Sequence, residues 1–190
     1  MKGALPRFVV TTLGFLPVTF ALWYFAGPVV TWPVRLLAAA VVHAGLDDIV
    51  RSVEQQASVI TFVTSLRPGN AAAAGAISVD VNALLYSYGM PMFAALALAA
   101  RDGAWAKKLL LGIAILLPFV TWGVVADFLK NIAFSAGPLV ASQTGFSQGE
   151  RQAIAFAYQF GALILPTVAP AATWVLMHRR FLERMRAQAR

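Results

Sequence analysis

Four long apolar stretches constrain this chain more than any other feature of its sequence. Each is close to the roughly 20 residues that an α-helix needs to cross a hydrocarbon core about 30 Å thick. They cover residues 8–26, 83–100, 106–128 and 152–177. Because 59% of the residues are hydrophobic and only 12% are charged, a large soluble domain is excluded. The sequence predicts a membrane α-helical protein with four transmembrane helices, forming a single membrane domain over residues 1–190.

The distribution of Lys and Arg predicts the orientation. Four spans put both termini on the same side of the membrane, and cytoplasmic segments near span ends carry an excess of positive charge. The side with the termini holds Lys2, Arg7, Arg101, Lys107, Lys108, Arg179, Arg180, Arg184, Arg186 and Arg190. The other side holds only Arg35, Arg51, Arg67, Lys130 and Arg151. We therefore expect cytoplasmic N- and C-termini, and we interpret the net charge of +7 as a topology signal rather than a nucleic-acid-binding surface.

The segment between the first two spans, residues 27–82, predicts a small outer (periplasmic) α+β subdomain. Prolines break the first helix, and residues 34–46 then form a short apolar helix expected in the outer interface. Residues 58–66 are rich in β-branched side chains, and residues 76–82 alternate between apolar and polar. We expect these two segments to form a β-hairpin, with residues 49–55 as a candidate third strand. A sheet this small is unstable alone, so it must lean on the membrane helices, the interfacial helix or a partner.

The junction between the last strand and the second span holds the densest polar and aromatic cluster. It consists of Asp80, Asn82, Tyr86 and Tyr88. One interpretation is a partner-docking surface or a lipid-headgroup site. The other is structural, with Asp80 and Asn82 turning the chain into the span and the tyrosines joining the interfacial aromatic belt.

Two polar groups lie within or beside the other spans. Asp127, at the outer end of the third span, is three residues from Lys130, a spacing that allows an ion pair. Gln159 lies deeper in the fourth span. A transport path needs polar groups near the membrane midplane, so an ion pair and an interhelical hydrogen bond are the simpler interpretations.

Nothing in the sequence predicts a cofactor, and no catalytic motif is present. His43 and Asp47 stand four residues apart and are weak candidate metal ligands, but metal sites need three or four ligands. An ion pair at a helix end is the simpler interpretation of these two residues. The chain has no cysteine, which removes thiolate nucleophiles and zinc–thiolate sites. We therefore do not expect an enzyme.

Two segments carry a resemblance to a known family. "LPVTFALWYFAGPVVTWPVRLLA" (residues 16–38) and "DVNALLYSYGMPMFAALALA" (residues 80–99), with the outer loop between them, resemble the small exosortase H-associated membrane proteins. Exosortases are multi-span proteins that process C-terminally sorted envelope proteins with a cysteine, an arginine and a histidine. The resemblance implies an accessory to protein sorting in a bacterial inner (cytoplasmic) membrane. Its partners would be membrane lipids and another membrane protein, either the sorting peptidase or its substrate. The chain cannot be that peptidase, because it lacks the cysteine.

Three hypotheses follow for the function. The first is a non-catalytic accessory protein that binds a membrane partner through its outer face. The second is a subunit of a small transporter or channel with a wet path near Asp127 and Gln159. The third is an enzyme that modifies lipid or envelope carbohydrate through His43, Asp47 or Asp80. An exposed edge strand would favour the first, because unpaired strand edges accept a strand from another chain.

Overall fold

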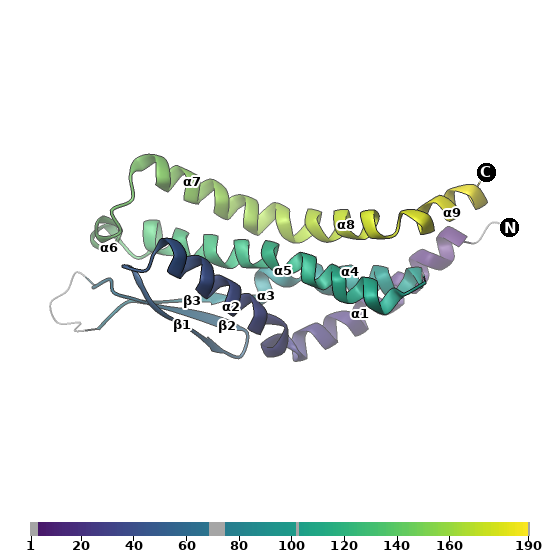
Figure 1. The fold of residues 1–190 in the computed structure, drawn as a ribbon, viewed down its shortest axis with the longest axis horizontal. Helices are drawn as coiled ribbons and strands as arrows, with labels where there is room; N and C mark the ends of the chain where they lie inside the picture. The colour runs from purple at the N-terminus through teal and green to yellow at the C-terminus, as the bar shows by residue number, and fades with distance from the viewer. Residues whose placement is uncertain (1–3, 69–74, 102, 190) are drawn as a thin grey trace.

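The chain folds into an elongated, mostly helical molecule with a small sheet near one end (Figure 1). The computed structural model describes residues 4–68, 75–101 and 103–189. The helices are α1 (Ala4–Phe25), α2 (Gly27–Gly45), α3 (Leu84–Ser87), α4 (Gly89–Ala100), α5 (Trp105–Lys130), α6 (Pro138–Gln143), α7 (Gln148–Gln159), α8 (Leu165–Met177) and α9 (Arg179–Ala189). Two short π-helical segments, η1 (Asn131–Ser135) and η2 (Phe160–Ile164), continue α5 and join α7 to α8. The strands are β1 (Val50–Gln56), β2 (Val59–Thr64) and β3 (Ser78–Asn82).

The predicted fold class is confirmed: four helices are long and apolar enough to cross a membrane, and a small antiparallel sheet accompanies them. These four helices cover Leu5–Phe25, Gly27–Gly45, Trp105–Ser135 and Gln148–Met177. The set differs from the prediction in one member. The stretch expected to span at 83–100 forms the shorter apolar helix Leu84–Ala100, whereas α2 reaches the required length.

The helix α2 is longer than the sequence suggested. It begins at Gly27 rather than at residue 34, after a break at Ala26, where α1 has ended. Pro28 lies in the first turn of α2, where a missing N–H costs nothing because that group has no partner within the helix. Pro33 is accommodated inside the helix. Pro28 therefore lies at the start of α2, and neither proline delays the helix to residue 34.

The path of the chain gives the molecule two layers along its long axis. The chain leaves the end that holds both termini through α1, returns through α4, leaves again through α5 and returns through α7 and α8 (Figure 1). The indole of Trp23 on α1 donates a hydrogen bond to the Ser87 hydroxyl at 3.1 Å, which sets the far end of α1 level with α3. From Leu5 to Trp23 the helix rises about 27 Å, close to the thickness of a hydrocarbon core.

The outer ends of the long helices extend beyond this level. Tyr86, in α3, lies against Gly123 of α5, and from Trp105 to Gly123 helix α5 also rises about 27 Å. The rest of α5, together with η1, α6 and α7, therefore forms a distal layer with α2 and the sheet. Although α2 is long and apolar enough to cross a membrane, it packs on β1 and α5 in this layer. This layer contains α2 and the sheet, the segment for which the sequence predicts an outer subdomain.

The sheet has the order β1-β2-β3 with antiparallel pairing throughout. The predicted strands at 58–66 and 76–82 correspond to β2 and β3, and the candidate strand at 49–55 corresponds to β1. The alternating side chains of one face are buried against the helices. At the centre of this face the ring of Phe62 stacks on Phe128 of α5, with the ring centroids 4.3 Å apart.

Helices α4 and α5 pack closely against each other at Gly112. Gly112 of α5 faces the fully buried ring of Phe93 on α4, and a Cβ atom at residue 112 would overlap that ring. We expect Gly112→Ala to lower the free energy of unfolding by about 1–3 kcal/mol through overpacking. Thermal unfolding of the detergent-solubilised protein measures the loss.

The matched control is Gly14→Ala in α1, where a Cβ atom meets nothing within 4 Å. That variant is expected to unfold at or slightly above the wild-type temperature, because alanine is the better helix former. Trimming the ring with Phe93→Leu in the Gly112→Ala background should recover part of the stability. Equal unfolding temperatures for the two glycine variants would contradict the close contact of α4 and α5.

Candidate functional site

The strand-to-helix junction is continuous, as the sequence suggested, and its first two polar residues support the turn. The Asn82 side-chain oxygen accepts a hydrogen bond from the Leu84 N–H at 3.1 Å, which supports the turn that leads into α3. Asp80 lies on the exposed face of the sheet and accepts a hydrogen bond from the Thr61 hydroxyl of β2 at 2.7 Å. Both side chains remain exposed while they make these contacts.

The two tyrosines of the junction do not join Asp80 and Asn82 on one surface. Tyr86 is buried, and its ring occupies the space that a side chain at Gly123 would need. The Tyr88 hydroxyl lies 3.1 Å from the Thr167 hydroxyl of α8, so it links α4 to the last long helix. The predicted four-residue cluster is therefore divided between an exposed pair on the sheet and a pair that packs within the helices.

The outer edge of β3 is the most accessible part of this junction. The Ala83 N–H donates to the Ser58 carbonyl at 3.0 Å, and in an antiparallel pair alternate residues direct their backbone groups toward the same neighbour. The odd-numbered residues of β3 therefore bond to β2. The even-numbered residues direct their N–H and C=O groups to the open side: Ser78, Asp80 and Asn82. Within the part of the chain that the structure describes, no other element hydrogen-bonds to these outward groups.

The opposite edge of the sheet, on β1, is closed by helix α2. The Arg35 guanidinium donates to the outward carbonyl of Val53 at 3.2 Å. The Gln55 amide donates to the Pro28 carbonyl and to the Thr31 hydroxyl, both at 2.9 Å. Polar groups of α2 thus occupy the positions that an added strand would need. The two edges of the same sheet differ, and β3 is the one that stays open.

A second polar cluster joins α5 to α7 next to Tyr86, whose side chain hydrogen-bonds to Asp127 and to Tyr158. The Lys130 ammonium lies 2.9 Å from an Asp127 carboxylate oxygen, as the spacing predicted. The Asn131 amide donates to the same oxygen at 3.1 Å. Lys130 also lies over the ring of Tyr158 on α7, 4.5 Å from its centroid. The carboxylate is therefore neutralised and hydrogen-bonded, and it lies in the last turn of α5.

The structure does not bring Gln159 into this cluster. Its side chain is exposed on α7, whereas its neighbour Tyr158 contacts Lys130. The groove next to the cluster, about 350 Å³ in volume, has an almost wholly apolar lining. It lies between α2, α5 and α7 and is lined by Leu37, Val41, Pro118, Thr121, Trp122, Val125, Ala126, Leu129 and Ala157.

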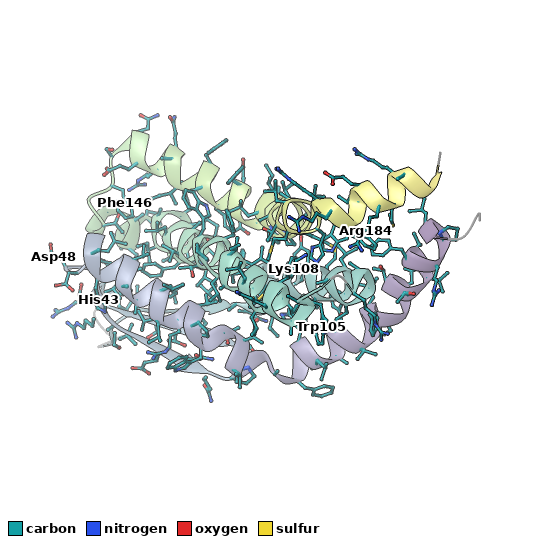
Figure 2. The ribbon with its side chains drawn as sticks, turned by 45° about the vertical axis from the view of Figure 1, so that its right-hand side comes forward. His43, Asp48, Trp105, Lys108, Phe146 and Arg184 are labelled. Carbon is teal, nitrogen blue, oxygen red and sulfur yellow. The ribbon has the colours of Figure 1, made fainter. Side chains whose placement is uncertain are left out.

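His43 and Asp47 form an exposed pair at the end of α2. The His43 Nδ1 lies 3.0 Å from an Asp47 carboxylate oxygen. Figure 2 shows His43 and Asp48 at the same end of the molecule as Phe146, with Arg184 at the opposite end. No group of three or more His, Cys, Asp or Glu side chains with the spacing of a metal site occurs among the described residues. This geometry matches an ion pair at a helix end, the simpler of the two interpretations of these residues.

Sequence reasoning missed several residues that shape these sites. Asn131 carried a readable signal, because it follows Asp127 by four residues and shares its helix face. Arg35 and Gln55 carried none, since each reaches its partner only after α2 has folded back along β1. Tyr158 likewise reaches Lys130 only through the packing of α7 on α5.

Comparisons with known proteins assign the family. The model of the family described as exosortase H-associated membrane protein matches residues 2–181, nearly the whole chain. No curated protein and no solved structure matches significantly. The resemblance noted in the sequence is confirmed: the chain belongs to the exosortase H-associated membrane protein family.

Proposed function

We propose that this protein is a non-catalytic accessory of an exosortase-type sorting system in the bacterial inner membrane, and that it holds its partner at the open edge of β3. The partner is the sorting peptidase or the envelope protein that it processes. The bias of Lys and Arg toward the end with the termini supports cytoplasmic termini and a periplasmic sheet. Membership of a family named for its association with exosortase supports the accessory role.

The observation that carries the proposal is the difference between the two sheet edges. Natural proteins usually cover or blunt an edge strand, as α2 does for β1. On β3 the outward backbone groups of Ser78, Asp80 and Asn82 form a short template to which an extended peptide adds as a fourth strand. The exposed Asp80 carboxylate would favour a partner strand with a basic residue opposite it.

The arrangement of the remaining polar groups gives less support to the alternatives. A transporter needs a hydrated path, yet the groove beside Asp127 is apolar and Gln159 is directed elsewhere. An enzyme built on His43, Asp47 and Asp80 needs these side chains to converge. His43 pairs with Asp47 at the end of α2, whereas Asp80 bonds to Thr61 on the sheet.

The edge of β3 can be tested by crosslinking in the native host. A photoreactive residue at Ser78, next to the open edge, should capture the sorting peptidase or a sorted substrate, identified by mass spectrometry. The same residue at Glu54, on the covered strand β1, should capture much less. Asp80→Pro removes the outward N–H without touching a bond to β2, so it should abolish capture at Ser78.

Asp80→Ala is the matched control for that substitution. It removes the hydrogen bond with Thr61 but keeps the outward N–H, so capture should persist. Unchanged capture in the proline variant, or capture of lipid alone at Ser78, would overturn strand addition at β3.

Substitutions in the polar cluster of α5 distinguish the accessory hypothesis from the transporter hypothesis. Under the proposal the cluster is structural, so Asp127→Asn should leave capture at Ser78 intact. It should lower the free energy of unfolding by about 1–3 kcal/mol, because Lys130 loses its charged hydrogen-bond partner. The double variant Asp127→Asn/Lys130→Met should be more stable than the sum of the two single changes predicts.

If Asp127→Asn keeps its full thermal stability but a proton or ion flux across proteoliposomes disappears, the transporter hypothesis replaces the accessory one.

A further inference from the structure

Three arginines line one pocket at the end of the molecule that holds both termini, far from the sheet. The pocket has a volume of about 520 Å³ and lies between α1, the end of α4 and α9. Arg7 comes from α1, Arg101 follows α4, and Arg184 belongs to α9. Phe8, Thr11, Ala99, Phe181 and Met185 complete the lining. The pocket therefore combines guanidinium groups with apolar side chains.

Aromatic contacts hold the walls of this pocket in place. The ring of Phe8 stacks on Trp174 of α8 with a centroid distance of 5.6 Å. The same ring lies 5.2 Å from that of Phe181 on α9. Because these rings join α1, α8 and α9, the positions of Arg7 and Arg184 relative to each other are set by packing. Arg184 is further oriented by a hydrogen bond from its Nε to the Arg180 carbonyl at 3.2 Å.

Arg101 occupies an unusual backbone position. It has φ of 38° in the left-handed region, where helices commonly end on glycine. A residue with a Cβ atom is strained in this conformation, so α4 ends less favourably than it would with glycine. Arg101 in this position is one of the residues that line the pocket.

The helix α9 is suited to lie at a membrane surface. Its polar face holds the exposed Arg179, Arg180 and Arg186, whereas Phe181 and Leu182 are directed toward the core. A basic amphipathic helix of this kind lies in the headgroup region.

We propose that this pocket binds the phosphate group of an anionic phospholipid in the leaflet that faces the termini. Guanidinium groups match phosphate oxygens in geometry and charge. Basic pockets between transmembrane helices are a recurring form of lipid recognition. The acyl chains would follow the exposed apolar side chains of α1, including Leu5 and Val9.

The test measures phospholipid affinity of the full-length protein in detergent by native mass spectrometry and thermal shift. The probes are phosphatidylglycerol, phosphatidylcholine with the same acyl chains, and inorganic phosphate. We expect preferential binding of phosphatidylglycerol. The double variant Arg7→Gln/Arg101→Gln should weaken it roughly five-fold per arginine.

Two further variants distinguish the pocket from general charge attraction and from misfolding. Arg179→Gln/Arg186→Gln removes the same charge from α9 outside the pocket and should keep the affinity near that of the wild type. Arg101→Gly suits the left-handed backbone at that residue, so it should fold at least as stably as the wild type and still lose affinity.

Three results would overturn the proposal. If the pocket and control double variants lose the same affinity for phosphatidylglycerol, the binding is a general attraction between positive charge and the lipid. Equal affinity for phosphatidylglycerol and phosphatidylcholine would show that the pocket does not select a lipid by the net charge of its headgroup. Stabilisation by inorganic phosphate matching that by phosphatidylglycerol would assign the pocket to a free anion.

Discussion

The packing of the sheet on the outer half of α5 is the contact on which the rest of the structure depends. A three-stranded sheet buries too little apolar surface to be stable by itself. Here the stacked rings of Phe62 and Phe128 join its centre to a helix that is already fixed in the membrane bundle. The helix α5 is therefore longer than a membrane span requires, and its extra turns provide the surface on which the sheet folds.

This arrangement also explains why the two edges of the sheet differ. One face of the sheet packs against α5, and α2 comes back along β1. There Arg35 of α2 donates to the outward Val53 carbonyl, and the Gln55 side chain of β1 donates to α2. Among the described residues no segment does the same for β3, and the chain passes directly from Asn82 toward α3. The continuity that anchors the sheet to the membrane is thus the same feature that leaves an edge open to a partner.

The two proposed binding regions lie at opposite ends of the molecule and use different chemistry. The edge of β3 offers backbone hydrogen bonds, which suit an extended peptide of many sequences. The arginine pocket offers fixed positive charge, which suits a phosphate group. A phospholipid held between α1, α4 and α9 would join these helices at the end of the molecule opposite the sheet.

Much of this protein could be predicted from its residues alone, because apolar length and two-residue alternation are local properties. The long apolar stretches predicted a helical membrane protein, and the pattern Ile77, Val79, Val81 predicted β3. The ion pair of Asp127 with Lys130 followed from helix spacing. Only the tertiary structure decided that Tyr86 is buried against Gly123, that α2 closes the β1 edge and that Arg7, Arg101 and Arg184 share a pocket. These features join residues far apart in the chain, and a local pattern cannot tell which distant surface will cover a given side chain.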